Sequence, residues 1–129
     1  MTTWTRDELN KIGTAEELEI ASLRRDGTLR KPTTIWVVRI GDDLYVRAIN
    51  GRTGAWFRGT QERNEGHIRA GGVDKAVAFV EEADPNINEQ IDAAYRTKYR
   101  RYAANIINTT LSPEARSATI KLVPRSTSS

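Results

Sequence analysis

The stretch from Thr33 to Gly59, TTIWVVRIGDDLYVRAINGRTGAWFRG, places the strongest constraint on the fold of this chain. Two runs within it, Ile35–Ile40 and Leu44–Ile49, are rich in the β-branched and aromatic residues that favour a pleated strand. The residues between the runs, Gly41–Asp43, are typical of a tight turn. The stretch therefore predicts a β-hairpin with a three-residue loop.

The register of this hairpin decides which side chains share a face. With a three-residue loop, one face is wholly apolar and pairs Ile40 with Leu44, Val38 with Val46, and Trp36 with Ala48. The other face is mixed and pairs Arg39 with Tyr45, Val37 with Arg47, and Ile35 with Ile49. A slip of one residue would mix apolar and charged side chains on both faces. We therefore expect one face to enter the core and the other to meet a ligand or partner.

Composition limits the size of the domain and the chemistry open to it. A chain of 129 residues suits one domain, predicted over residues 1–124, with 125–129 as a disordered tail. The absence of cysteine and the presence of a single histidine, His67, exclude the common thiolate and multi-histidine metal sites, so we expect no metal. The net charge of +3 favours anionic partners only weakly. No signal peptide or membrane-spanning run is present in the sequence, which predicts a cytoplasmic protein without membrane association.

The residues before the hairpin predict one helix and two strands. TRDE at positions 5–8 has the spacing of a capping box, so a short helix should run to about Ile12. The alternation over Leu18–Leu23 predicts a strand, and Asp26-Gly27 suits the turn that follows it. The chain should then return as a second strand, which Pro32 interrupts.

The residues after the hairpin predict two more strands. The polar segment 60–72 contains turn signals around a short strand at His67–Ala70. The β-branched content of Asp74–Ala83 favours a strand over a helix, and Asp84-Pro85 should end it.

The C-terminal part predicts helices and a closing strand. Asn86–Ile107 has apolar residues at spacings of three and four, which predicts one long helix. Ser112-Pro113-Glu114 is typical of a second helix start, and the alternation over Ala118–Val123 predicts the last strand. The predicted fold is mainly β with α: an antiparallel barrel of about six or seven strands, with a C-terminal helix before the last strand.

Two segments, IWVVRIGDDLYVRAINGRTGAWFRG at 35–59 and IDAAYRTKY at 91–99, resemble an uncharacterised bacterial family, the domain of unknown function DUF2255. The pattern of that family covers most of the chain. The family is distantly similar to the flavin-binding split barrels, which include pyridoxamine-phosphate oxidases and deazaflavin-dependent nitroreductases. The resemblance implies an antiparallel split barrel and a homodimer with its ligand at the subunit boundary. The cofactor would be FMN or a deazaflavin, or the barrel would have lost it.

The similarity to the nitroreductases is carried by the residues that follow the hairpin. In those proteins a glycine-containing loop and a Trp-Tyr-x-Asn-Leu segment come next, and the similar runs here are Asn50–Gly54 and Ala55–Gly59. Arg58 and Gly59 depart from that pattern. The basic glycine loop that precedes the hairpin in those enzymes has loose counterparts in Arg24, Arg25 and Lys31. The resemblance therefore implies the fold more directly than the cofactor.

The loop after the hairpin is the first candidate binding site. Backbone N–H groups, a guanidinium and a hydroxyl are the groups that a phosphate needs, and the loop offers them from Asn50, Gly51, Arg52 and Thr53. A Gly-x-x-Gly segment is also common as a plain flexible turn, and that interpretation stays open.

An aromatic residue between two arginines is the second candidate. Arg47 and Arg58 could converge beside Trp56, and an isoalloxazine ring needs an apolar slot with a cation near its N1 and O2 atoms. In the alternative interpretation Arg47 pairs with an acidic residue at a subunit interface, and Trp56 belongs to the core.

The predicted long helix carries the third candidate. Tyr95, Lys98 and Tyr102 share one helical face and could contact a phosphate or an aromatic ligand. Alternatively these side chains cover the end of the barrel. His67 has no carboxylate at a readable spacing, so we expect no acid–base role for it.

Three functional interpretations follow. The first is a flavin- or deazaflavin-dependent oxidoreductase in which the cofactor supplies the chemistry. The second is a cofactor-free barrel that binds or transforms another small aromatic or anionic ligand. The third is a nucleic-acid or protein interaction module, which the modest net charge of +3 disfavours.

Overall fold

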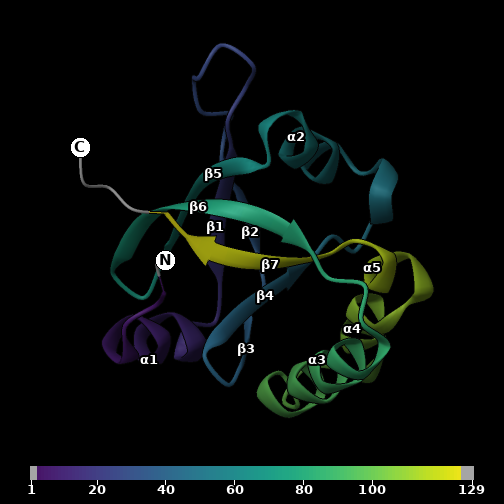
Figure 1. The fold of residues 1–129 in the computed structure, drawn as a ribbon. Helices are drawn as coiled ribbons and strands as arrows, with labels where there is room; N and C mark the ends of the chain where they lie inside the picture. The colour runs from purple at the N-terminus through teal and green to yellow at the C-terminus, as the bar shows by residue number, and fades with distance from the viewer. Residues whose placement is uncertain (1–2, 126–129) are drawn as a thin grey trace.

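The computed structural model describes residues 3–125, which fold into one curled antiparallel sheet with helices packed around it (Figure 1). The strands are β1 (Leu18–Ser22), β2 (Thr33–Ile35), β3 (Val38–Ile40), β4 (Asp43–Arg47), β5 (Glu65–Ala70), β6 (Val73–Glu81) and β7 (Thr119–Pro124). The helices are α1 (Arg6–Thr14), α2 (Ala55–Arg63), α3 (Pro85–Lys98), α4 (Ala104–Leu111) and α5 (Pro113–Ser117), with a 3-10 turn, η1, at Gly51–Thr53. The predicted class, mainly β with α, is confirmed.

The order of the strands explains how the sheet closes. It runs β2-β1-β5-β6-β7-β4-β3, and every neighbouring pair is antiparallel. The predicted strand Ile35–Ile40 is in fact divided: β2 pairs with β1, β3 pairs with β4, and only Trp36 and Val37 separate them. One bent segment therefore supplies both edges of the sheet, and the sheet curls until those edges approach each other. This architecture is a split barrel.

The bend between β2 and β3 leaves Val37 outside the strand ladders. Its backbone N–H donates to the hydroxyl of Tyr99 (3.3 Å), and its carbonyl accepts from Nζ of Lys98 (2.6 Å). Tyr99 donates in turn to the carbonyl of Glu16 (2.7 Å), and its ring stacks on Trp36 with centroids 3.8 Å apart. The end of α3 therefore stabilises the bend by satisfying backbone groups that the strands do not pair.

Two apolar clusters lie on the two sides of the β3–β4 hairpin. The larger one fills the barrel and includes Leu44 and Val46 from β4. The smaller one lies between the hairpin and the helices, and its buried members are Val38, Tyr45, Ile91, Tyr95, Tyr99 and Ile107. Both faces of the hairpin are therefore buried.

The predicted register of this hairpin is wrong by one residue. Val38 pairs with Tyr45 and Ile40 with Asp43, so Gly41-Asp42 alone form the turn. Gly41 has a φ of 60°, which suits the first position of a two-residue hairpin turn. The prediction assumed one buried and one free face. Because α3 covers the second face, polarity could not select the register.

Residues 55–63 form a helix, although the sequence predicted no helix there and a polar, turn-rich segment from residue 60. Gly54 is the N-cap of α2, and Asn64, in the left-handed conformation with a φ of 56°, ends it. A glycine and two adjacent aromatic residues lower the helix propensity of this segment. Tertiary packing outweighs that propensity, because Phe57 and Thr60 are buried.

The predicted helix Asn86–Ile107 is two helices, because α3 ends at Lys98 and α4 begins at Ala104. Tyr99, just after α3, and Ile107, within α4, pack into the same apolar cluster. The apolar spacing therefore continues across the break although the backbone turns. The apolar periodicity therefore predicted correctly which side of this segment is buried, but it did not predict the break between α3 and α4.

Several local signals are confirmed. Thr5 and Glu8 form the predicted capping box of α1. Asp84 caps α3 with Pro85 in the first turn, and Ser112 caps α5. β6 is a strand, as its β-branched content predicted.

Of the predicted disordered tail, residues 126–129 lie outside the described residues. Within residues 3–125, the helices are too short and too polar for any of them to cross a membrane.

Candidate functional site

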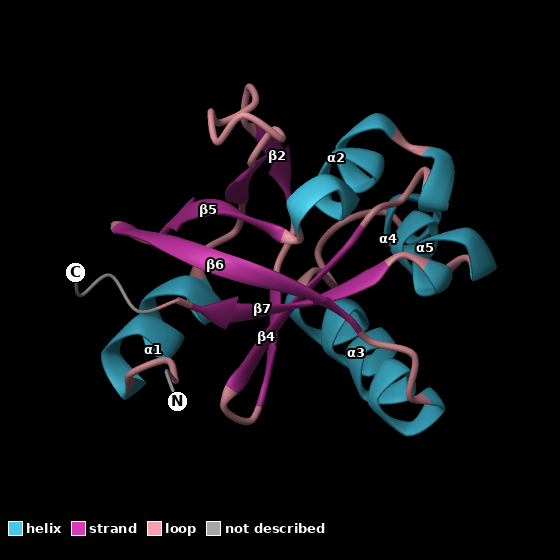
Figure 2. Ribbon diagram, turned by 45° about the horizontal axis from the view of Figure 1, so that its top comes forward, coloured by secondary structure: helices cyan, strands magenta, loops and turns pink. Residues whose placement is uncertain are grey.

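Two hollows meet at Trp56, and together we call them the Trp56 cleft. The aromatic slot has a volume of about 200 Å³ and is lined mainly by Trp36, Arg47, Ile49, Trp56, Tyr95 and Ile106. The basic hollow has a volume of about 280 Å³ and is lined mainly by Ser22, Arg24, Arg30, Lys31, Trp56 and Thr60. Trp56 belongs to α2, which lies at the end of the molecule away from α1 (Figure 2).

The N-terminal turn of α2 places Trp56 between the hollows. Gly51, with a φ of 76°, begins η1 and packs against Glu114 of α5. The chain then enters α2 at Gly54. Phe57 is fully buried, and its ring meets the ring of Trp56 edge-on at 6.4 Å between centroids. Phe57 therefore anchors the turn in the barrel, which leaves Trp56 half-buried and in contact with both hollows.

The aromatic slot has apolar walls and an apolar mouth. Trp36 and Trp56 contribute aromatic rings. Ile49 and Ile106 line the slot yet remain 50% and 44% exposed. Large apolar side chains at that exposure surround an opening that suits a flat, apolar group.

Arg47 forms a buried part of the slot lining and is fully engaged with protein acceptors. It donates to Oγ1 of Thr119 (3.0 Å), Oδ1 of Asp92 (2.5 Å), the carbonyl of Thr110 (2.9 Å), and the carbonyl (3.1 Å) and side-chain oxygen (2.9 Å) of Asn88. A guanidinium has five N–H groups, so none is left for a ligand. Arg47 therefore links β4, β7, α3 and α4 behind the slot.

Tyr95 lies against Arg47, whose guanidinium carbon is 5.7 Å from the ring centroid. Burial raises the pKa of Tyr95 well above its ordinary value, although the guanidinium and the backbone amide of Arg47 oppose the rise. The phenol is therefore protonated at neutral pH. Within residues 3–125 its hydroxyl hydrogen has no hydrogen-bond acceptor, and the residue lines the slot. The group is available to donate to a molecule bound there.

The basic hollow combines cations with a helix N-terminus. Arg24, Arg30 and Lys31 come from the loop between β1 and β2, which projects from the barrel in Figure 1. The first turn of α2 contains no acidic residue, and its N-cap makes no side-chain hydrogen bond. Free N–H groups and the helix dipole favour an anion at this position. The hollow therefore suits a phosphate or carboxylate group.

The predicted site residues separate into two groups. Arg47, Trp56 and Tyr95 come together in the aromatic slot. The others line neither hollow: Asn50, Gly51, Arg52, Thr53, Arg58 and Lys98.

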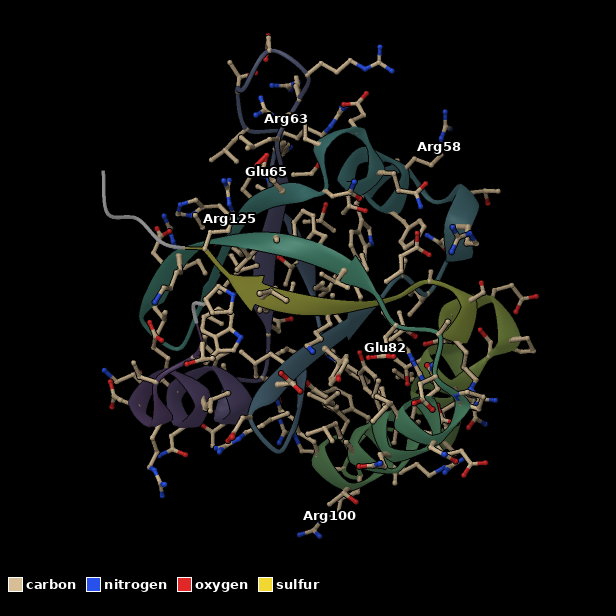
Figure 3. All side chains as sticks on the ribbon, viewed as in Figure 1. Arg58, Arg63, Glu65, Glu82, Arg100 and Arg125 are labelled. Atoms are coloured by element: carbon tan, nitrogen blue, oxygen red, sulfur yellow. The ribbon has the colours of Figure 1, made fainter. Side chains whose placement is uncertain are left out.

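These other residues have structural partners or face solvent. Arg52 pairs with Glu81 (2.5 Å) and thereby lowers the pKa of that carboxyl group, although burial opposes the shift. Arg58 points outward from α2 (Figure 3). Lys98 lies at the bend of the sheet, where burial lowers the pKa of its amine to about 8.

Sequence reasoning missed Ser22 and Arg30 as cleft residues. Ser22 is only 6% exposed at the end of a buried strand, and a serine in such a pattern was the available signal. Arg30 pairs with Glu62 of α2, a contact across 32 positions that requires the fold to be known.

The expectation that His67 lacks a carboxylate partner is wrong. Its Nδ1 lies 2.6 Å from Oδ1 of Asp74 on the neighbouring strand, and Asp74 also pairs with Arg69 (3.3 Å). These residues line a separate hollow of about 230 Å³ beside Leu29. The pair is therefore not part of the Trp56 cleft.

The chain matches one protein family by sequence and several solved structures by fold. Residues 8–122 match the model of a family described as uncharacterised proteins conserved in bacteria, DUF2255. Among solved structures, a Listeria innocua protein named as a pyridoxamine 5'-phosphate oxidase is similar, with a TM-score of 0.62, 14% identity, and coverage of 92% of this chain and 90% of that one.

Two further solved structures are similar over nearly their whole length. An F420 reductase matches with a TM-score of 0.57 and 13% identity, covering 93% of each chain. An FAD-binding protein from Mesorhizobium loti matches with a TM-score of 0.59 and 14% identity, covering 97% of this chain and 93% of that one. No curated protein matches the sequence significantly. At these identities the likeness to solved structures shows the fold alone.

Proposed function

This chain belongs to the DUF2255 family, and we propose that its Trp56 cleft binds a flat aromatic cofactor with an anionic tail, a flavin or deazaflavin nucleotide. The observation that carries the proposal is the pairing of an aromatic slot with a basic hollow on the two sides of one tryptophan. The names of the similar structures, an FAD-binding protein and an F420 reductase, support it at the level of the fold.

The sizes of the two hollows favour a ligand that spans both. Each has a volume below 300 Å³, whereas pockets for small molecules usually exceed about 300 Å³. A ring system in the slot and a phosphate in the basic hollow would use the apolar and the charged halves together. The residues present therefore fit a flavin-type nucleotide.

The chain's own residues would bind and orient such a group. A flavin or deazaflavin supplies hydride transfer, which explains how the protein could act without a catalytic triad. Trp56 offers its ring to the aromatic system, and the hydroxyl of Tyr95 can donate to a ring carbonyl. Arg47 contributes indirectly, because its hydrogen bonds fix the position of β4 against α3.

The mouth of the slot suggests a homodimer. Ile49 and Ile106 expose apolar surface beside the aromatic rings, and a second copy of the chain would remove that surface from water. Sedimentation of the purified wild-type protein and of Ile106→Asp measures the oligomeric state directly. A monomeric wild-type protein would remove the dimer from the proposal and leave the cleft unchanged.

A second candidate function rests on the slot alone. A volume of about 200 Å³ also suits a smaller aromatic anion without a nucleotide tail. In that case the protein is a cofactor-free binding protein, and a thermal-shift screen of aromatic carboxylates and phosphates should yield a ligand.

Binding of the cofactor can be measured by titrating FMN, FAD and a deazaflavin nucleotide while recording their visible spectra. We expect a shifted spectrum with at least one of them and a loss of affinity of about tenfold or more in Trp56→Ala. Arg58→Ala is the control, because it changes an exposed residue of the same helix. Unchanged spectra with all three cofactors at millimolar concentration would overturn the proposal and favour the second candidate.

A further inference from the structure

Arg30 lines the basic hollow and is already paired with a carboxylate of the protein. Its guanidinium pairs with Glu62 of α2, and the side chain crosses α2 at Gly59. A Cβ atom on Gly59 would come within 3.0 Å of Nε and 3.1 Å of Cδ of Arg30, so only glycine permits this path without a shift. Gly59 is one of the two residues at which this sequence departs from the nitroreductase pattern.

The pairing with Glu62 leaves part of Arg30 unsatisfied. Its Nε atom is shielded from water and has no hydrogen-bond partner among residues 3–125. A buried N–H without an acceptor raises the free energy of the state that contains it. The Arg30–Glu62 pair itself is partly exposed, with side-chain exposures of 36% and 31%, so it contributes little stability. A better acceptor would therefore compete easily with Glu62.

The hydroxyl of Ser22 is a second donor in the same region. The residue is 6% exposed, lines the basic hollow, and its hydroxyl has no hydrogen-bond partner in the described part of the chain. Oγ of Ser22 and Nε of Arg30 lie 2.8 Å and 3.0 Å from the position of a Cβ on Gly59. Both donors therefore border the same small region, beside Gly59 in the middle of α2.

We propose that Glu62 occupies Arg30 in place of a ligand phosphate, and that an entering phosphate displaces Glu62 and accepts from Arg30 and Ser22 together. Lys31 and Arg24, which line the hollow, add positive charge. The inference rests on the proposed function for its natural ligand, a phosphate-bearing cofactor. The anion site itself is independent of the aromatic slot.

Inorganic phosphate tests the site without any cofactor. Its affinity is measured by isothermal titration against sodium chloride at equal ionic strength. We expect Glu62→Gln to bind phosphate about three- to tenfold more tightly, because Arg30 is released, and Arg30→Gln and Ser22→Ala to bind it about tenfold more weakly. Arg63→Gln is the matched control: it removes the same charge from a residue that pairs with Glu65 outside the hollow (Figure 3).

A double variant separates displacement of Glu62 from a general effect of charge. In an Arg30→Gln background, Glu62→Gln should change phosphate affinity less than twofold, because there is no arginine left to release. A full-sized gain in that background would overturn the inference, and so would wild-type affinity in Ser22→Ala and Arg30→Gln.

FMN and riboflavin connect the anion site to the cofactor. Glu62→Gln should tighten FMN binding and leave riboflavin, which lacks the phosphate, within twofold of its wild-type affinity. Equal effects on both would overturn the assignment of this site to the phosphate. If the phosphate affinities of the variants change as expected but no flavin binds, the anion site is supported and the proposed cofactor is ruled out.

Discussion

Arg47 and Arg30 line the two halves of the Trp56 cleft and differ in how completely their hydrogen bonds are made. All five N–H groups of Arg47 have acceptors in the protein. Arg30 has one carboxylate partner and a buried Nε with none among the described residues. A guanidinium with every donor satisfied belongs to the framework, whereas one with a donor left over can respond to a ligand. The same contrast distinguishes Tyr99, which both accepts and donates, from Tyr95, whose hydroxyl hydrogen has no acceptor among residues 3–125.

The largest expected effect comes from removing the satisfied guanidinium. Arg47→Met should lower the free energy of unfolding by about 3–5 kcal/mol, because it removes the donor to Oδ1 of the largely buried Asp92 and one of the two donors to the side-chain oxygen of Asn88. Arg30→Met should cost less than about 1 kcal/mol. Urea denaturation of both variants measures the difference. Equal losses would contradict the distinction between the two arginines.

Tyr99→Phe should have the next largest effect on stability. The substitution leaves the backbone N–H of Val37 and the carbonyl of Glu16 without the hydroxyl that pairs them, at a cost of about 1–3 kcal/mol. Thermal unfolding followed by circular dichroism gives the value. A melting temperature equal to that of the wild type would show that water replaces the hydroxyl at the bend.

Tyr95→Phe should affect ligand binding more than stability. Because the hydroxyl of Tyr95 donates to no group among the described residues and only accepts from the backbone N–H of Arg47, its loss should lower the free energy of unfolding by about 1 kcal/mol or less, which is below the loss in Tyr99→Phe. The affinity for a bound flavin should nevertheless fall by about tenfold. The two measurements use the same protein preparation. A destabilised variant with unchanged flavin affinity would place Tyr95 with Tyr99 in the framework.

The smallest effect is a pH dependence that originates at Lys98. Burial lowers the pKa of its amine from 10.5 to about 8, so between these two values the unfolded chain binds more protons than the folded one. Stability therefore rises with pH from about 8 to about 10.5, and the cost of the buried charge is fully present below pH 8. Relative to Lys98→Met, the wild type should gain less than about 1 kcal/mol over this window, because the amine is partly exposed. Denaturant unfolding at pH 7.5 and 10 tests the sign.

Local patterns predicted much of the fold because their causes are local. The capping box at Thr5–Glu8, the Asp84-Pro85 start of α3 and the strand β6 all follow from residues within a few positions of one another. The hairpin register failed for a different reason. It depended on α3, about 50 residues later, covering the face that was expected to be free. No pattern within the hairpin contains that information.

The candidate site was predictable to the extent that its residues carry their own signal. Trp56, Arg47 and Tyr95 are large or charged residues within recognisable segments, and the structure brings them together. Arg58 does not join them because Ala55–Arg63 is a helix, which turns that side chain outward. Ser22 and Arg30 can be recognised as site residues only once the contact of the β1–β2 loop with α2 is known.

The bend at Trp36-Val37 also bears on how the protein avoids aggregation. It divides what would be one long edge strand into β2 and β3, each only three residues long. Short edges offer few unpaired backbone groups to another chain. A change that straightened this segment would join the two short edges into a continuous one, on which further copies of the sheet could add strand by strand.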